Sequence, residues 1–587
     1  MIMSINTVPR PEHPQPMMRR ENWLSLNGEW MFEFDFGSSG TERQLFKPEK
    51  DGEYTKKITV PFCPESELSG IGYKDFIDSV WYKRKIKLTK DRLNGRVLLH
   101  FGAVDYRCTV YVNGKTAGSH CGGYSSFSLD ITELLSEGEN DITVSATDDV
   151  RSRKQPRGKQ AGSYYSKGCD YTRTTGIWQS VWLEFVPSGY IKTAKYYPNI
   201  KEGSFDIELT VSSAGRLKVE AYYENSQVGT SEKNIYGNFV RIHLPLAQKH
   251  LWEVGKGRLY DLKFIFETEK GTDVLFSYAG LREVTIDGFK VLINGRSVFQ
   301  RTVLDQGFYP DGIYTAPSDE ALKRDIELAM NLGFNGARLH QKIFEPRFLY
   351  HCDRAGYLVW EEHANWGMNL NKEGALLNFL PEWSEIIERD FNHPAIIGWC
   401  PFNETWGEFG ATARQIIKAV YDETKRLDPT RPVIDASGGY HVKTDIYDQH
   451  DYDQDPESLY KSYKDYNGTK ESFKWVFSDI QDYIPHLPLF LSEFGGIKWI
   501  PEANRETSSE NAWGYGDAPI VEDEFFTRYE GFVSSLLKIK NIMGFCYTQL
   551  YDIEQEVNGL YTYERAPKFP DYSRIIAANN KKAAIEE

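Results

Sequence analysis

The sequence predicts a multidomain fold of class β plus α/β, in which two β-sandwich domains precede a (β/α)8 TIM barrel. Short strands with Gly-rich turns fill the first part of the chain, and a Pro-Ser-Gly segment at 187–189 divides them. After about Glu283 strands alternate with helices instead. We therefore expect three domains in this chain of 587 residues, with the bounds 1–187, 188–282 and 283–587.

The first predicted domain contains short strands separated by turns. Residues 108–112 read Cys-Thr-Val-Tyr-Val and are followed by Asn113 and Gly114. Asn-Gly readily adopts the positive φ angles of a type I′ turn, which predicts a β-hairpin here. Further strand candidates are 96–101, 140–146 and 180–185. Many short strands of this kind favour a sandwich.

The second predicted domain, 188–282, shows the same texture at smaller size. It includes the alternating segments 205–211, 216–222 and 260–266. About seven strand candidates in roughly a hundred residues are typical of an immunoglobulin-like β-sandwich.

The barrel is predicted from strands and helices in regular succession. Ser318 is a good N-cap, apolar residues recur at Leu322, Ile326 and Met330, and Gly333 should end that helix. Eight apolar segments alternate with such helices: 297–304, 335–339, 357–361, 395–400, 432–436, 444–447, 488–492 and 542–547. Eight strand–helix units in about 280 residues match the size of a (β/α)8 barrel.

Composition excludes several functions. The net charge of −15 disfavours nucleic acid and anionic membrane surfaces as partners. No stretch is apolar enough to span a membrane, and residues 1–22 lack a signal-peptide core, so we expect a cytoplasmic protein. The seven cysteines are scattered without a CxxC motif, which predicts free thiols. Aromatic residues reach 14%, enough to fill the cores and to leave platforms for a flat-faced sugar.

Two glutamates follow predicted barrel strands. Glu404 comes after the fourth strand and Glu493 after the seventh, 89 residues apart (493 − 404). That is about 30 residues per unit, close to the barrel's own repeat of roughly 31. Since active sites of these barrels lie at the C-terminal strand ends, we expect both carboxylates on one catalytic face.

Paired carboxylates in an aromatic-rich site are the equipment of glycoside hydrolysis. One carboxyl must give a proton to the leaving oxygen, and the other must be ionised to attack the anomeric carbon. The alternatives are two unrelated surface residues, or a carbohydrate-binding protein on a silent barrel. No metal and no cofactor are predicted, because two carboxylates need no metal electrophile and no paired-ligand motif such as HExxH occurs.

At these residues the chain resembles glycoside hydrolase family 2. The resemblance rests on Asn403-Glu404, on Ser-Glu-Phe-Gly-Gly at 492–496, and on the N-terminal segments 17–30 and 105–114. It implies a jelly-roll sugar-binding-type domain, an immunoglobulin-like domain and a catalytic barrel, in that order. It also implies that Glu404 is the acid/base, that Glu493 is the nucleophile, and that Asn403 binds the sugar's 2-hydroxyl.

The resemblance extends to further candidate substrate-binding residues near the strand ends. Arg338 resembles the family's buried arginine that supports the nucleophile, and His340 and Gln341 stand where many members have Ser-His. The other candidates are Asp305, His450, Tyr452, Trp366, Trp406 and Tyr547; Tyr547 stands where many relatives place a Trp beneath the sugar.

The sugar is less well specified. Glucuronidases of the family carry an Asn-x-Lys pair for the substrate carboxylate, whereas residues 554–562 here read Glu-Gln-Glu-Val-Asn-Gly-Leu-Tyr-Thr. Without that cation we expect a neutral sugar and a retaining exo-acting β-galactosidase. Arabinosidase, galactofuranosidase, β-mannosidase and β-glucuronidase activity remain alternatives, as does endo action. Self-association and a role for the segment 453–483 are also open.

Overall fold

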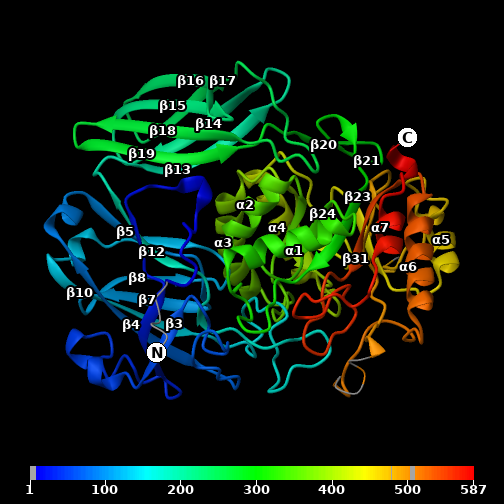
Figure 1. Cartoon of the computed structure of the whole chain (residues 1–587), viewed down its shortest axis with the longest axis horizontal. Coiled ribbons are helices and arrows are strands. Elements are labelled where there is room, and N and C mark those ends of the chain that lie inside the picture. Colours follow the sequence, from blue (N-terminus) through cyan, green and yellow to red (C-terminus); the bar gives the residue numbers. More distant parts are fainter. Residues whose placement is uncertain (1–7, 478, 503–504, 506–508, 587) are drawn as a thin grey trace.

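The computed structural model describes residues 8–477, 479–502, 505 and 509–586. Figure 1 shows the N-terminal β domain in blue and cyan, the second β domain in green above it, and the barrel beside both. Separate hydrophobic cores fill the two β domains and the barrel. The fold class predicted from the sequence is confirmed, whereas the exact domain bounds stay predictions. The expectation about residues 1–22 falls partly outside the described residues, since 1–7 are not among them.

The N-terminal domain is a sandwich of two antiparallel sheets, ordered β1-β12-β5-β9 and β3-β2-β4-β10-β7-β8. The predicted hairpin joins β7 to β8 through Asn113 (φ 50°) and Gly114 (φ 75°). The strands are β1 (Trp23–Ser25), β2 (Gly28–Phe34), β3 (Lys56–Val60), β4 (Ser79–Leu88), β5 (Arg96–Phe101), β6 (Val104–Asp105), β7 (Arg107–Val112), β8 (Lys115–Cys121), β9 (Phe127–Asp130), β10 (Gly138–Thr147), β11 (Gly176–Ile177) and β12 (Val181–Val186).

The second domain packs a three-stranded sheet, β13-β14-β17, against a four-stranded one, β16-β15-β18-β19. Residues alternate between buried and accessible along β17 and β18, as expected for strands with one face on a core. The strands are β13 (Ile191–Asn199), β14 (Ser204–Val211), β15 (Gly215–Tyr223), β16 (Ser226–Ile235), β17 (Phe239–Pro245), β18 (Tyr260–Thr268) and β19 (Gly271–Ala279).

A small antiparallel sheet leads into the barrel, whose parallel sheet runs β26-β25-β24-β23-β31-β30-β29. The fifth barrel strand is only a short one, β28. It pairs with β27, and just before it Val433 forms an isolated bridge with Trp399. The strands are β20 (Val284–Asp287), β21 (Lys290–Ile293), β22 (Arg296–Ser297), β23 (Gln300–Asp305), β24 (Gly336–Leu339), β25 (Leu358–Glu362), β26 (Ile396–Cys400), β27 (Phe402–Asn403), β28 (Ala436–Ser437), β29 (Tyr447–Asp451), β30 (Leu489–Gly495) and β31 (Ile542–Thr548).

The sixth barrel strand lies later than predicted. The sequence pattern placed it at 444–447, but β29 covers 447–451, because Thr444 holds a turn in which its Oγ1 donates to Ile446 O at 2.7 Å. His450 therefore lies inside the strand, with its side chain at the catalytic face.

Helices surround the parallel sheet. They are α1 (Asp319–Asn331), α2 (Pro346–Ala355), α3 (Gly374–Asp390), α4 (Ala411–Leu427), α5 (Pro456–Tyr463), α6 (Glu522–Leu537) and α7 (Ser573–Asn579). Ser318 caps α1 as predicted, accepting from Ala321 N. The segment 453–483 contains α5, which packs against α6, so part of this stretch is the barrel's own sixth helix.

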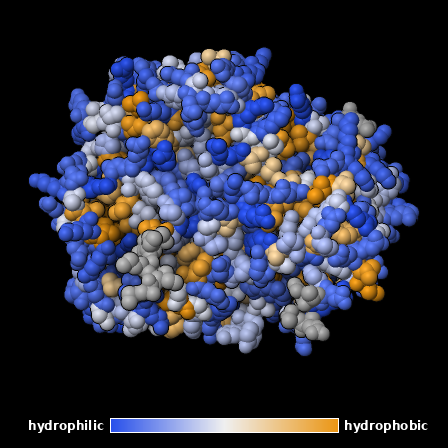
Figure 2. All heavy atoms as spheres, in the orientation of Figure 1, coloured by the Kyte–Doolittle hydropathy of each residue, from blue (hydrophilic) through white to orange (hydrophobic). Residues whose placement is uncertain are grey.

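The surface in Figure 2 is mostly hydrophilic, with small apolar groups between the polar ones. No helix of the described residues is long and apolar enough to cross a membrane. All seven cysteines are free, as predicted.

Candidate active site

The structure brings Glu404 and Glu493 together at the C-terminal ends of the barrel strands. Glu493 belongs to β30, and Glu404 directly follows β27 with a left-handed backbone (φ 45°). The Glu404 amide donates to Ser437 O at 2.8 Å, which fixes the turn that presents the side chain. One carboxylate oxygen of each glutamate and a ring nitrogen of His450 all lie within 4.8 Å of one another.

His450 lies between the two carboxylates. Its Nδ1 is 2.7 Å from Glu404 Oε1 and 3.4 Å from Glu493 Oε2. Burial alone would lower the pKa of the imidazole, but the charge of Glu493 and the hydrogen bond to Glu404 outweigh it and raise that pKa. His450 is therefore a donor that links the two glutamates.

Glu493 is held in its ionised form. Arg338 Nη1 donates to its Oε1 at 2.6 Å, and Tyr452 OH donates to its Oε2 at 2.5 Å. Burial opposes ionisation of this carboxyl, but His450 and Arg338 outweigh burial and lower its pKa. Tyr452 is itself fixed by stacking on Tyr515, with ring centroids 3.4 Å apart.

Behind this pair lies Glu362, a buried carboxylate at the end of β25 that sequence reasoning missed. It accepts from Arg338 Nη2, and its Oε1 is 2.9 Å from His340 Nδ1. Its only sequence signal was the charged end of an otherwise apolar strand, Leu-Val-Trp-Glu-Glu. His340 thus contacts Glu362 directly and lies 3.9 Å from Glu493 Oε1.

Asn403 lies beside Glu404 and contacts the arginine that holds Glu493. Its Oδ1 accepts from Arg338 Nη2 at 2.5 Å, while its buried Nδ2 has no acceptor among the described residues. Trp366 Nε1 donates to Asn403 O at 3.3 Å, which places the indole at the edge of the site. An unused amide donor at this position is available to a substrate hydroxyl.

Tyr547 and Asp305 lie differently from what was expected, and Trp406 stays an untested stacking candidate. Tyr547 is wrong as a sugar platform: its ring packs on Tyr529 of α6, with centroids 5.0 Å apart, so it faces the helix layer. Asp305 is buried, and its Oδ1 accepts from Tyr551 OH and Gly307 N instead of facing the pair. Trp406 is 57% exposed beyond Glu404, at the outer side of the site.

The N-terminal domain also reaches the site, which the sequence did not indicate. Tyr171 OH donates to the buried carboxylate of Glu556 in the loop after β31, and Trp513 Nε1 donates to Gly168 O at 2.6 Å. Figure 1 shows this cyan segment running along the barrel near the red loops that follow β31. Residues from two domains therefore line the catalytic face.

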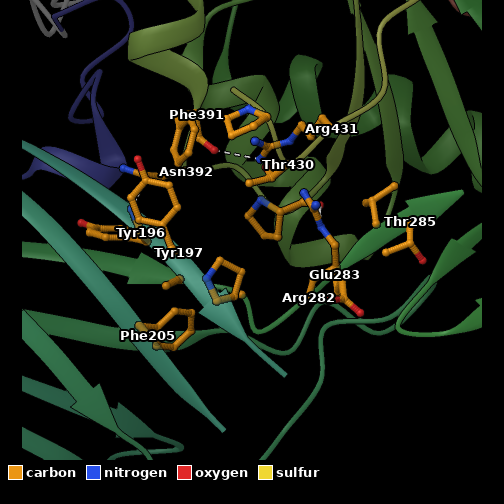
Figure 3. A pocket seen from close by; sticks show the side chains of 16 residues that line it. Tyr196, Tyr197, Phe205, Arg282, Glu283, Thr285, Phe391, Asn392, Thr430 and Arg431 are labelled. Carbon is orange, nitrogen blue, oxygen red and sulfur yellow. Dashed lines mark hydrogen bonds between the residues drawn. The ribbon is translucent and has the colours of Figure 1, made fainter. Parts of the chain in front are cut away.

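A different cavity, of about 300 Å³, lies between the second domain and the opposite end of the barrel. Figure 3 shows aromatic side chains such as Tyr197 and Phe391 on one side and Arg282 and Arg431 on the other. Both arginines donate to backbone carbonyls, among them Ile396 O at the start of β26. This cavity joins domains and lies away from the catalytic pair.

Glu404, His450 and Glu493 are also the one group among the described residues whose donor atoms could share a metal ion. In the structure those atoms already satisfy one another through the His450 hydrogen bond. The prediction that no metal is required stays a prediction.

Comparison with known proteins is consistent with this architecture. The models for the sugar binding domain and the TIM barrel domain of glycosyl hydrolases family 2 match residues 24–187 and 284–496, together more than half of the chain. The β-glucuronidase of Sus scrofa is 28% identical over 72% of this chain and 69% of its own length. A Formosa agariphila protein named "Putative beta-glucuronidase" is 28% identical over 71% of this chain, which spans half of that protein's length.

Solved structures share the fold. A β-glucuronidase from Ruminococcus gnavus in complex with D-glucuronic acid has a TM-score of 0.78 at 19% identity, covering 97% of this chain and 100% of that one. One from an uncultured Clostridium species has a TM-score of 0.78 at 22% identity, covering 96% and 99%. With both family models matched in the expected order, the chain belongs to glycosyl hydrolases family 2.

Proposed function

We propose that this protein is a retaining, exo-acting β-glycosidase. The observation that carries the proposal is the short separation of the Glu404 and Glu493 carboxylates, whose oxygens approach within 4.8 Å. Retaining enzymes hold their carboxyl groups about 5–5.5 Å apart, whereas inverting enzymes leave about 6.5–9.5 Å for a water molecule. Exo action is supported by the contact of the N-terminal segment, at Gly168 and Tyr171, with the loops at the catalytic face.

In the proposed mechanism Glu493 attacks the anomeric carbon while Glu404 protonates the departing glycosidic oxygen. The C–O bond to the aglycone breaks as the bond to Glu493 Oε2 or Oε1 forms. Glu404, now ionised, takes a proton from water, and that water's oxygen displaces Glu493 from the sugar. The two inversions return the sugar with its original β configuration.

The surrounding residues support these steps. Arg338 keeps Glu493 ionised and oriented before attack, and Tyr452 directs its second oxygen. His450 lies within ion-pair distance of both carboxylates and can therefore stabilise negative charge on either one. The free Nδ2 of Asn403 is placed for the sugar's 2-hydroxyl, a contact that strengthens in the transition state.

For the glycone we propose a neutral hexose, with a β-galactoside as the first test. Glu556 and Asn558 occupy the loop where a glucuronidase of the family carries its Asn-x-Lys pair, and a sugar carboxylate there would meet a buried carboxylate. A β-glucuronide is the second candidate, favoured by the names of the relatives. Arabinosides, galactofuranosides and mannosides complete the panel.

The test is a set of 4-nitrophenyl glycosides combined with two mechanistic readouts. Proton NMR of the first-formed product should find the β anomer, and a 2-deoxy-2-fluoro glycosyl fluoride should label Glu493 in a peptide map. An α product from a β substrate would overturn the retaining mechanism. Inertness toward every glycoside, together with no labelling, would overturn the glycosidase proposal.

A further inference from the structure

One segment of the N-terminal domain is pinned directly against the catalytic face. Arg157 N donates to Trp366 O at 2.8 Å, and Gly158 N donates to Ala364 O at 3.1 Å. Gly158 has φ 58°, and a Cβ atom there would lie 2.3 Å from the carbonyl oxygen of Gln341. Only glycine allows this approach, so the backbone delivers the next residue, Lys159, to a fixed place.

Lys159 is a mostly buried lysine whose Nζ has no polar partner among the described residues. The residue is 6% exposed, and its Nζ lies 4.4 Å from the ring centroid of Trp366. Among the described residues its Nζ makes no hydrogen bond and no ion pair. A buried ammonium is costly unless it is paired, and a ring face satisfies only part of that requirement. The unused Nζ donors are therefore available to an acceptor on a ligand.

Glu556 provides the complementary acceptor. It is 3% exposed, accepts from Tyr171 OH, and accepts from Asn558 Nδ2 at 2.9 Å. Burial lowers the pKa of Lys159, but Cys169, Glu556 and the catalytic pair outweigh burial and raise it, so the ammonium stays protonated at neutral pH. No hydrogen bond or ion pair joins Lys159 to Glu556 among the described residues, but both are held to Tyr171: its backbone N donates to Lys159 O at 2.6 Å, and its hydroxyl donates to Glu556.

We propose that Lys159 and Glu556 together select the glycone, the ammonium donating to and the carboxylate accepting from hydroxyl groups of one neutral sugar ring. The inference rests on the proposed glycosidase function and deepens it. A hydroxyl can satisfy a cation and an anion at once, because it both accepts and donates. A uronic acid would instead add a carboxylate to a site that already holds Glu404, Glu493 and Glu556, where, among the described residues, Lys159 is the cation without an acidic hydrogen-bond partner.

The test compares Lys159→Met and Glu556→Gln on a neutral β-glycoside and on its 3-, 4- and 6-deoxy analogues. Each substitution should lower kcat/KM for the parent glycoside by about 10- to 100-fold, the scale of a hydrogen bond to a charged group. On the analogue that lacks the bound hydroxyl, each substitution should change kcat/KM by less than about threefold. Lys167→Met, an exposed lysine in the same segment, is the matched control and should behave as wild type.

The outcomes separate this inference from the glycosidase proposal. If wild type labels on Glu493 but Lys159→Met loses equal activity on parent and all deoxy analogues, the hydroxyl contact is wrong. If wild type prefers a β-glucuronide and Lys159→Met abolishes that preference, Lys159 binds a carboxylate and the neutral-sugar inference is overturned. If wild type neither turns over nor labels, the proposed function itself fails. Urea unfolding of each variant checks that the fold is intact.

Discussion

The two glutamates proposed to be catalytic lie on the same barrel face in unequal surroundings. Glu493 is 4% exposed and is held by Arg338, Tyr452 and His450. Among the described residues, the Glu404 side chain has His450 as its one polar partner, and Glu404 itself has a left-handed backbone beside the exposed Trp406. The difference matches two tasks: a nucleophile must stay ionised in one orientation, whereas an acid/base must change charge twice and face the leaving group.

The largest expected effect comes from removing the carboxylate of Glu493, the more tightly held of the two glutamates. Glu493→Gln should lower kcat by roughly 10⁴-fold or more, because no covalent intermediate can form. Initial rates on a chromogenic glycoside measure it, with stability checked by urea unfolding. A variant that retained wild-type kcat would contradict the assignment of Glu493.

The second prediction concerns Glu404, which must gain and lose a proton in the proposed mechanism. Glu404→Gln should lower kcat/KM by roughly 10²- to 10⁴-fold for an alkyl glycoside, the usual range for general acid catalysis. A 2,4-dinitrophenyl glycoside needs little protonation, so its loss in kcat/KM should be much smaller. The ratio of the two losses is the measurement, and an equal loss on both substrates would rule out an acid role.

The third prediction concerns Glu362, the buried carboxylate that binds Arg338 next to Glu493. Burial raises the pKa of Glu362, but Arg338 and His340 outweigh burial and lower it from 4.5 to about 2. Its ionised form therefore stabilises the fold above about pH 4.5, and this contribution is lost as the pH falls toward 2. Glu362→Gln should lower the free energy of unfolding by about 3 kcal/mol at pH 6.

The stability difference between wild type and Glu362→Gln should narrow at pH 3. Urea denaturation at both pH values measures it. A difference that does not depend on pH would mean that packing, and not charge, carries the contribution of Glu362.

The fourth prediction concerns Trp406, the exposed indole beside Glu404. Trp406 is 57% exposed, so Trp406→Ala should leave stability nearly unchanged. If the indole stacks on the aglycone, KM for an aryl glycoside should rise about three- to tenfold with little change in kcat. Tyr236→Ala, on the 89% exposed Tyr236 of the second domain, is the control. An unchanged KM would remove Trp406 from the substrate-binding residues.

The smallest expected effect is none. Exhaustive dialysis against EDTA should leave kcat/KM unchanged, because His450 already links Glu404 and Glu493 by hydrogen bonding and charge. The assay is repeated after adding back Mg²⁺, Ca²⁺ or Zn²⁺. Loss of activity that a metal restores would instead make these three residues ligands.

The sequence predicted the parts of the molecule that follow a repeat. Glu404 and Glu493 were found because βα units recur at a near-constant length, and α1 because Ser318 and its apolar spacing are local signals. Tyr547 was misplaced because side chains alternate faces along a strand, and Thr548, its neighbour, is the residue that contacts Tyr452. Because neighbouring strand residues face opposite sides, the side chain that points into the site belongs to Thr548 and not to Tyr547.

The rest of the site depends on distant contacts. Glu362 looked like the end of a buried strand, and only the fold reveals Arg338 and His340 beside it. Lys159 lies in a segment without strand or helix pattern, and its place depends on Gly158 approaching Gln341 from another domain. Such contacts leave no periodic trace in a single sequence.

The hydrogen bond from Tyr171 to Glu556 makes the site depend on both ends of the chain. The two partners are 385 residues apart in the chain, so the catalytic face is complete only when the last barrel loops contact the N-terminal domain.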